Sequence, residues 1–125
     1  MSKTILIIED DIDIRELASI ALELEEYSVI KAENGAEALV LLSEMKFIDL
    51  PFCILLDISM PIMNGFEFLE KLRVHPKPEL ANIPVIIATA KGSTFTEHES
   101  SKAFKVIKKP FDLDQLYSTI AEIQS

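Results

Sequence analysis

The sequence predicts an α/β fold in which a doubly wound, parallel sheet of five strands carries helices on both faces. Short apolar runs alternate with segments whose apolar residues recur at helical spacing, and this alternation is typical of βαβ units. Side chains suited to chemistry follow several of the runs, as expected where parallel strands end at a site. The chain has 125 residues and no repeat or low-complexity tract, so we expect a single domain over residues 1–125.

The first half of the chain predicts two strands, each followed by a helix. Residues 4–9 are expected to form a fully buried strand, and residues 28–32 form a shorter second strand. The intervening helix is expected to present one apolar face, formed by Ile14, Leu17, Ala18, Ala21 and Leu22. The second helix shows the same spacing at Ala36, Leu39, Val40 and Leu42.

The second half predicts three further strands, at residues 52–57, 83–89 and 104–108. Parallel strands cannot be joined by a tight turn, so a crossover helix is required between the last two. The sequence supports it poorly, because residues 93–102 hold one large apolar residue and no amphipathic stripe. We therefore expect this crossover helix to be short or mobile.

Two further helices are predicted around these strands. The helix after the third strand carries apolar residues at Phe66, Leu69 and Leu72. It is expected to end near Val74, because the prolines that follow lack a backbone donor and clash with the preceding turn. Asp112 is a candidate N-cap for the last helix. That helix is expected to present one apolar face, formed by Leu113, Leu116, Tyr117, Ile120 and Ala121.

The composition argues against several classes of protein. The net charge of −9 disfavours nucleic-acid binding, because phosphate contacts require clustered lysine and arginine. A single cysteine, Cys53, excludes an internal disulfide, and its position within a predicted strand is typical of a small core residue. No apolar run approaches membrane-spanning length, and no basic stretch precedes a hydrophobic region at the N-terminus. We expect a cytoplasmic protein without a membrane partner.

Acids, a hydroxyl group and an ammonium group lie at the ends of four predicted strands. Glu9 and Asp10 follow the first strand, and Asp57 ends the third. Thr89 and Lys109 lie at the ends of the last two strands. The carboxyl ends of strands in an open parallel sheet converge on one crevice, so these groups are expected to meet. Their combination predicts a metal-dependent phosphoryl site.

Four sequence stretches in this order resemble the receiver domain of two-component response regulators. They are residues 7–11 (IIEDD), 55–65 (LLDISMPIMNG), 84–90 (PVIIATA) and 108–111 (KKPF). The resemblance extends over nearly the whole chain. It implies a flavodoxin-like receiver fold with strand order 2-1-3-4-5, and a protein that accepts a phosphoryl group in a two-component or phosphorelay system.

The resemblance also implies which acids act. Asp57 matches the phosphoacceptor, whose carboxylate can form an acyl phosphate. Glu9 and Asp10 match the acidic pair that holds a divalent cation together with Asp57 and the backbone carbonyl of Ser59. The family more often has two aspartates there, so Glu9 is a variant. Oxygen ligands at a phosphate site favour Mg²⁺. We interpret Asp11 as a residue that starts the following helix, with a role in metal binding as the alternative.

Two other groups and the protein partners follow from the same resemblance. Lys109 matches the lysine that pairs with Asp57 and then with the phosphoryl oxygens, and Thr89 matches the hydroxyl that bonds the phosphoryl group. A histidine kinase or a histidine phosphotransfer protein would donate the phosphoryl group, and a downstream protein would read the result. Receivers catalyse their own phosphotransfer and autodephosphorylation, so we do not expect an enzyme with a separate substrate.

One position departs from the family. Most receivers carry tyrosine or phenylalanine three residues before the lysine, and rotation of that ring reports phosphorylation. This chain has Val106 there. We expect phosphorylation chemistry to persist, while partner choice or signal propagation differs from that of a chemotaxis-type receiver.

Three other functions account for less of the pattern. A haloacid-dehalogenase-like phosphatase also uses a nucleophilic aspartate, but it normally has a second aspartate where this chain has Ser59. A flavodoxin-like flavin carrier would need a phosphate loop after the first strand, where the acids would repel phosphate. A passive scaffold would not require every phosphorylation residue. The receiver is expected either to stand alone, with a docking surface as its output, or to be a fragment of a longer regulator.

Overall fold

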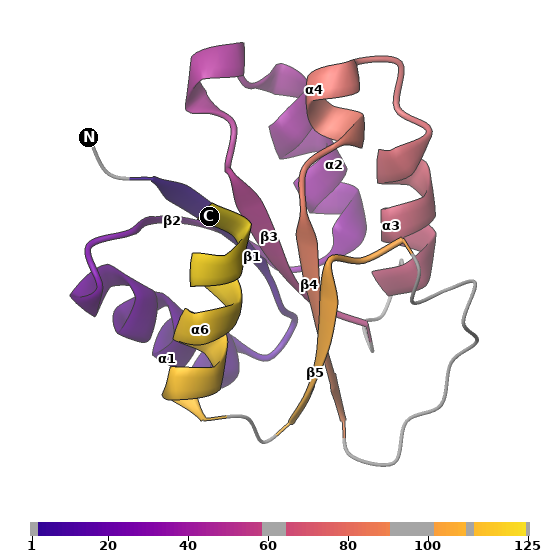
Figure 1. The fold of residues 1–125 in the computed structure, drawn as a ribbon. Coiled ribbons are helices and arrows are strands. Elements are labelled where there is room, and N and C mark those ends of the chain that lie inside the picture. Colours follow the sequence, from indigo (N-terminus) through magenta and orange to yellow (C-terminus); the bar gives the residue numbers. More distant parts are fainter. Residues whose placement is uncertain (1–2, 59–64, 91–101, 110–111, 125) are drawn as a thin grey trace.

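The computed structural model describes residues 3–58, 65–90, 102–109 and 112–124 (Figure 1). Five parallel strands form one sheet in the order β2-β1-β3-β4-β5, which confirms the predicted fold class and strand order. The strands are β1 (Thr4–Ile8), β2 (Ser28–Ala32), β3 (Cys53–Asp57), β4 (Val85–Ala90) and β5 (Lys105–Lys109).

Helices cover both faces of the sheet. Figure 1 shows α1 and α6 on one face and α2, α3 and α4 on the other. The predicted crossover helix between β4 and β5 falls almost wholly outside the described residues. A short 3₁₀ helix and the short helix α4 were not predicted. The helical elements are α1 (Ile12–Leu24), α2 (Gly35–Glu44), η1 (Phe47–Asp49), α3 (Gly65–Arg73), α4 (Pro78–Ala81) and α6 (Leu113–Gln124).

Alternation along the strands divides the core into two clusters. Ile5 and Ile7 of β1 point to the side of α1 and α6, whereas Leu6 and Ile8 point to the side of α2, α3 and α4. Successive side chains of a strand leave opposite faces of the sheet, so both faces must be apolar when helices cover both. All five residues of β3 are buried, as expected for the central strand.

The predicted apolar face of α1 is partly wrong. Ile14 and Leu17 are 39% and 69% exposed. The buried positions of this helix are Arg15, Ser19, Ala21 and Leu22. The helix is therefore rotated relative to the predicted face. Exposed residues also interrupt the predicted face of the second helix at Val40, and that of the last helix at Leu113 and Ala121.

The start of α6 agrees with the sequence. The carboxylate of Asp112 accepts a hydrogen bond from the backbone N–H of Gln115 at 2.7 Å, so Asp112 acts as the predicted cap. On the other helical face of the sheet, Pro78 occupies the first turn of α4, where a missing N–H costs nothing.

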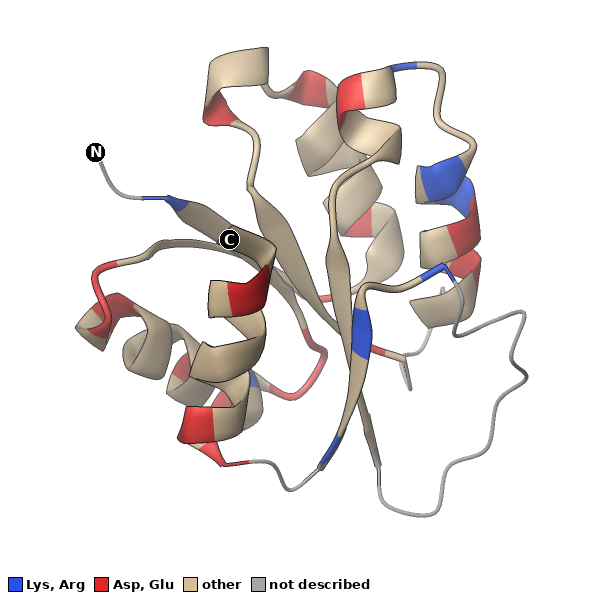
Figure 2. Cartoon of the chain, in the orientation of Figure 1, with Lys and Arg blue, Asp and Glu red and all other residues tan. Residues whose placement is uncertain are grey.

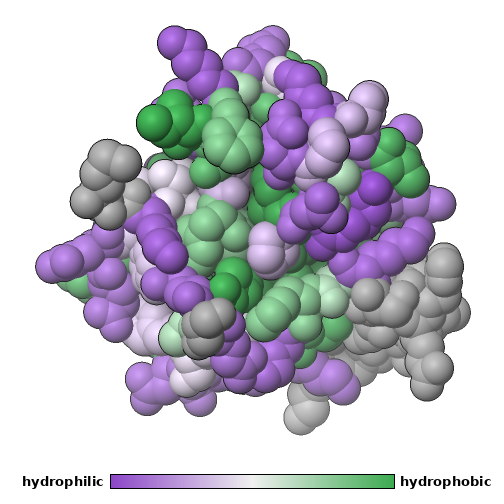
Figure 3. Space-filling view, turned by 45° about the horizontal axis from the view of Figure 1, so that its top comes forward, coloured by the Kyte–Doolittle hydropathy of each residue, from purple (hydrophilic) through white to green (hydrophobic). Residues whose placement is uncertain are grey.

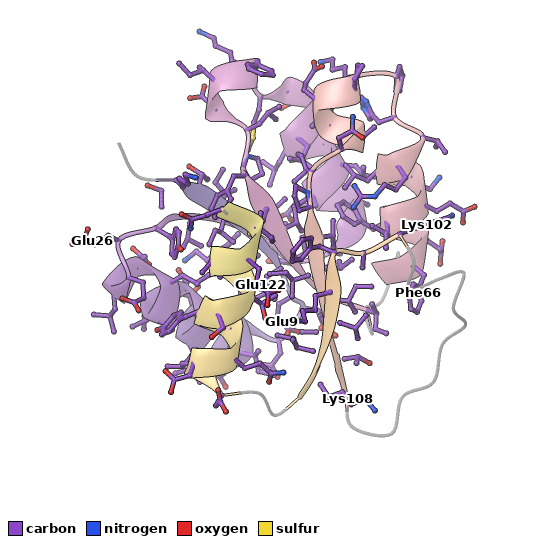
Figure 4. All side chains as sticks on the ribbon, viewed as in Figure 1. Glu9, Glu26, Phe66, Lys102, Lys108 and Glu122 are labelled. Atoms are coloured by element: carbon purple, nitrogen blue, oxygen red, sulfur yellow. The ribbon has the colours of Figure 1, made fainter. Side chains whose placement is uncertain are left out.

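Exposed ion pairs join the two edge strands to the neighbouring helices. Lys31 of β2 lies 3.1 Å from Glu16 of α1, and Lys105 of β5 lies 3.2 Å from Glu122 of α6, which is labelled in Figure 4. Figure 2 shows the lysines along β5 and the acids on α1 and α6. Exposed pairs of this kind contribute at most about 1 kcal/mol each. Lysines on edge strands also discourage pairing with another sheet.

The face at the amino-terminal ends of the strands is a mixture of polar and apolar side chains (Figure 3). Phe47 and Ile48 of η1 are exposed, as is Val74 just after α3. No helix in the described ranges combines the length and the apolar character that crossing a bilayer would require.

Cys53 lies fully buried in β3, which confirms its interpretation as a core residue. Burial raises the pKa of its thiol from 9.0 to about 12. We expect native Cys53 to resist a thiol reagent at about pH 8, where the urea-unfolded chain reacts readily. The buried neutral thiol favours folding below about pH 9, and this contribution falls as the pH rises toward 12. Equal reaction rates of the folded and unfolded chains would contradict this placement.

Candidate functional site

The structure brings three of the predicted site residues together at the carboxyl edge of the sheet. Glu9 follows β1, and Asp57 is the last residue of β3. Ile8 pairs with Leu56 across these two strands, so the next residue on each strand reaches the same edge. Carboxylate oxygens of Glu9, Asp10 and Asp57 all lie within 4.8 Å of one another. Figure 4 labels Glu9 in the lower half of the view, toward the strand ends.

Burial and charge make this cluster suited to a cation. Glu9 is 4% exposed and Asp57 is 6% exposed, while Asp10 is open to solvent. Two ionised carboxylates 4.8 Å apart repel by roughly 3.5 kcal/mol at an effective dielectric constant of 20, before any neighbouring cation is counted. A divalent cation would turn this repulsion into attraction. A donor set made only of oxygen fits Mg²⁺.

The wall beneath the cluster is largely apolar. A cavity of about 20 Å³ lies between the sheet and α1, beside Glu9 and Asp57. Its lining combines the two buried acids with aliphatic side chains of the sheet and the helix, namely Ile7, Ile8, Glu9, Ile14, Ala18, Leu55, Asp57 and Ala88. Apolar surroundings of this kind strengthen electrostatic interactions at the edge of the sheet, because they screen charge poorly.

Backbone contacts fix Glu9 on both sides. Its N–H donates to the carbonyl of Ala32 at 3.1 Å, and its carbonyl accepts from Nη1 of Arg15 at 2.8 Å. Neither Ala32 nor Arg15 was identified from the sequence. An arginine near the start of a helix commonly lies at the surface, so the sequence does not reveal that Arg15 bonds to Glu9. The contact of Ala32 uses its backbone carbonyl, which every residue type has, so it leaves no sequence signature.

Asp11 starts α1, as predicted. Its carboxylate accepts from the backbone N–H groups of Asp13 and Ile14, at 2.9 and 3.1 Å. The backbone N–H of Asp11 in turn donates to Oε2 of Glu9 at 3.4 Å. These bonds are those of an N-cap residue, and the side chain of Asp11 is not among the three grouped carboxylates.

Thr89 lies at the same edge with an unusual hydroxyl group. Ala88 pairs with Asp57 across β3 and β4, so Thr89 is the next residue beyond that pair. The residue is fully buried. Within the described residues, its Oγ1 is the buried side-chain polar atom that lacks a hydrogen-bond partner. Buried polar groups are normally bonded, so this hydroxyl is a candidate to meet a ligand.

The last two predicted positions are described less fully. The backbone of Lys109 ends β5 opposite Ala90, which brings it to the carboxyl edge of the sheet beside β4. The side chain of Lys109 and the whole of Ser59 lie outside the described part of the chain. Lys108 is exposed, as the alternation of the strand predicts, and is labelled in Figure 4.

The sequence matches a known protein family and known relatives. Residues 5–121 match the family described as "Response regulator receiver domain". The CpxR homolog of Haemophilus influenzae, described as a transcriptional regulatory protein, is 37% identical over 98% of this chain. The match covers 50% of that protein, so the chain spans about half the length of this relative.

Solved structures agree with this assignment. The chemotaxis protein CheY4 of Vibrio cholerae superposes with a TM-score of 0.85 at 27% identity, over 98% of this chain and 99% of that one. The response regulator TrrA of Thermotoga maritima, solved in complex with Mg²⁺-BeF, gives a TM-score of 0.80 at 30% identity over 97% and 98%. The family match, the strand order and the clustered acids agree, and the chain belongs to the response regulator receiver family.

Proposed function

We propose that this chain accepts a phosphoryl group on Asp57 from a phosphohistidine, with a divalent cation held by Glu9, Asp10, Asp57 and the backbone carbonyl of Ser59. Response regulator receivers are signalling proteins, and the chain belongs to that family. The observation that carries the proposal is the approach of three carboxylates to within 4.8 Å at one edge of the sheet. The complex of TrrA with Mg²⁺-BeF supports Mg²⁺ as the cation.

The chemistry assigned to Asp57 is nucleophilic substitution at phosphorus. One carboxylate oxygen of Asp57 forms the new bond to phosphorus, while the bond from phosphorus to the histidine nitrogen breaks and imidazole leaves. Bound Mg²⁺ would neutralise charge on the phosphoryl oxygens and align them for transfer. The backbone contacts of Glu9 and the end of β3 hold the acids in place before the donor arrives.

We propose that two further groups bind the phosphoryl oxygens. The hydroxyl of Thr89 is buried without a partner, so it can donate to an oxygen that arrives with the phosphoryl group. Lys109 ends the neighbouring strand, and its ammonium group would pair with another of these oxygens. Both assignments follow the resemblance to the family.

Replacing Thr89 with valine is expected to slow phosphorylation without lowering stability. The valine removes an unpaired buried hydroxyl, so the free energy of unfolding should stay constant or rise by up to about 1 kcal/mol. Phosphorylation by acetyl phosphate should slow about tenfold or more, because a donor to the phosphoryl group is lost. Urea denaturation and intact mass spectrometry measure the two effects.

Thr119 provides the matched control for this substitution. It is also buried, but its hydroxyl donates to the carbonyl of Gln115 in α6 at 2.8 Å. Thr119→Val should therefore leave the phosphorylation rate unchanged. A wild-type rate in Thr89→Val would remove Thr89 from the proposed mechanism.

The proposed phosphoryl donor is a histidine kinase or a histidine phosphotransfer protein. The relative from Haemophilus influenzae is a transcriptional regulatory protein about twice as long as the matched segment. Val106 packs half-buried against the core cluster on the α2, α3 and α4 side, where most receivers carry an aromatic ring. We propose that the downstream protein recognises a conformational change on this face other than the rotation of an aromatic ring, and that this change occurs around Val106.

Acetyl phosphate tests the proposed function without a protein partner. The chain is incubated with acetyl phosphate and Mg²⁺, and intact mass spectrometry counts the phosphoryl groups gained. The expected result is a gain of one phosphoryl group by the wild type, with no gain by Asp57→Asn and none without Mg²⁺. Asp49→Asn, at an exposed acid of η1, is the control and should behave as wild type. Full phosphorylation of Asp57→Asn would refute the proposal.

A further inference from the structure

We propose that Arg15 is a positioning residue for the cation site, because it holds the peptide unit that joins Glu9 to Asp10. This inference rests on the proposed function, since it concerns the same cation. The carbonyl of Glu9 accepts a hydrogen bond of 2.8 Å from Nη1 of Arg15. That carbonyl and the N–H of Asp10 belong to one planar unit.

The burial of Arg15 sets it apart from a surface arginine. The residue is 9% exposed, although arginine is rarely buried unless it is paired. Over the described ranges of the chain, Arg15 forms no ion pair, and its side chain donates to the Glu9 carbonyl. A guanidinium group keeps its charge under all ordinary conditions and offers donors on a rigid fork. The fold therefore places a strong donor beside the acids without tying up a carboxylate.

The bond between Arg15 and Glu9 links the first turns of α1 to the end of β1, where two of the proposed metal ligands lie. The backbone N–H of Arg15 donates to the carbonyl of Asp11 at 2.9 Å in the first turn of α1, and Asp11 caps the same turn. The side chain of Arg15 then returns to the residue that precedes Asp10. On the other side, the N–H of Glu9 is fixed by the carbonyl of Ala32. Rotation of the peptide between the two acids would break the bond from Arg15 to the Glu9 carbonyl.

The direction of the two carboxylates depends on this peptide. The two dihedral angles that flank this peptide, ψ of Glu9 and φ of Asp10, set the direction of Asp10 relative to Glu9. The bond from Arg15 to the Glu9 carbonyl restrains both angles. Glu9 and Asp10 supply two of the three grouped carboxylates. Groups that orient metal ligands typically change metal affinity by 10- to 100-fold when they are removed.

Charge and positioning predict opposite results when Arg15 is replaced. As a positive charge near the acids, Arg15 would oppose a second cation, and its removal would tighten Mg²⁺ binding. As a positioning residue, Arg15 keeps the carboxylates in place, and its removal would weaken Mg²⁺ binding. Arg15→Met keeps an unbranched apolar side chain and removes both the donor and the charge. The sign of the change in Mg²⁺ affinity therefore separates the two roles.

The test is isothermal titration calorimetry with Mg²⁺ on the full chain. We expect Arg15→Met to raise the dissociation constant for Mg²⁺ by about tenfold. In the acetyl phosphate reaction, the Mg²⁺ concentration at half-maximal rate should rise by a similar factor, whereas the rate at saturating Mg²⁺ should stay within about threefold of wild type. A dissociation constant that is unchanged or lower in folded Arg15→Met overturns the inference.

Arg73 supplies a matched control. Its guanidinium group donates to the carbonyls of Lys102, Ala81 and Ile83 at 3.0, 3.0 and 2.7 Å. These carbonyls precede β4 and β5, at the opposite edge of the sheet from Glu9, and Figure 4 labels Lys102 there. Arg73→Met should lose stability and keep the wild-type dissociation constant for Mg²⁺. An equal loss of Mg²⁺ affinity in Arg73→Met would mean that general loosening is the cause, which also overturns the inference.

A second variant covers the case in which Arg15→Met does not fold. Arg15→Lys keeps the charge on a shorter side chain, and we expect this variant to raise the dissociation constant for Mg²⁺ by about threefold or more.

Mg²⁺ binding and phosphorylation, measured on the wild type and on the Arg15 variants, distinguish the positioning role of Arg15 from the proposed function. Wild-type phosphorylation together with unchanged Mg²⁺ binding in the Arg15 variants rejects the positioning role alone. Mg²⁺ binding by the wild type without any phosphorylation rejects the proposed function alone.

Discussion

Asp10→Asn is expected to weaken Mg²⁺ binding by one to two orders of magnitude or so and to slow phosphorylation by acetyl phosphate at a fixed Mg²⁺ concentration. Asp10 is the solvent-exposed member of the three grouped carboxylates, so it is the first of them that an entering cation meets. The same substitution should raise the melting temperature of the metal-free protein, because one of three mutually repelling charges is gone. Calorimetry and thermal melting with and without Mg²⁺ measure both effects.

Asp11→Asn is the control for that substitution. Asparagine caps a helix as well as aspartate does, so the first turn of α1 should remain intact. Because Asp11 lies outside the grouped carboxylates, the dissociation constant of the Asp11→Asn variant for Mg²⁺ should differ from that of the wild type by less than about threefold. If the two variants lost Mg²⁺ affinity equally, the cluster would be no more than a region of negative charge.

Gly65→Ala is expected to lower the free energy of unfolding by about 3 kcal/mol. A Cβ at this position would overlap the α-carbon of Ile58 and would lie 2.7 Å from its Cγ2. The N–H of Gly65 also donates to the carbonyl of Ile58 at 3.0 Å, so the two backbones cannot separate without losing this bond. A urea denaturation curve should show the midpoint shifted down by roughly 1–3 M.

A double variant tests whether the backbone contact is the cause. Ile58→Ala removes the Cγ2 atom but leaves the α-carbon, so adding it should not rescue Gly65→Ala. Because Ile58 directly follows Asp57, a displaced backbone should also slow phosphorylation. A wild-type midpoint in Gly65→Ala would show that α3 can begin at this position without the close approach.

The sheet and its acids could be predicted because strong local signals specify them. Apolar runs identified the five strands, and the end of each run identified the residues that reach the carboxyl edge. This was sufficient to predict that Glu9, Asp10 and Asp57 would meet, and they lie within 4.8 Å of one another. The order of the strands came from the resemblance to the family.

The buried face of α1 could not be predicted, because polar residues occupy it. Periodicity favoured Leu17 for the core, yet Leu17 is largely exposed and Arg15 is buried. The buried Arg15 donates a hydrogen bond to the carbonyl of Glu9, and a helical pattern of apolar residues carries no signal for such a bond. Hydrophobic periodicity therefore missed the residue that we propose to position the acids.

Short helices were missed for a related reason. The prolines after α3 were interpreted only as helix breakers, although proline is also favoured in the first turn of a helix. Pro78 starts α4, and Leu80 of that helix is buried in the core. A segment of four residues is too short to show periodicity, so its packing decides its structure.

A crystal structure with Mg²⁺ and beryllium fluoride tests the central claim most directly. The expected result is one Mg²⁺ about 2.1 Å from carboxylate oxygens of Asp10 and Asp57, with Glu9 bound to it directly or through water. The fluoride adduct is expected on Asp57, with the hydroxyl of Thr89 bonded to a fluorine. A cation bound away from these carboxylates, or an adduct on another residue, would contradict the account.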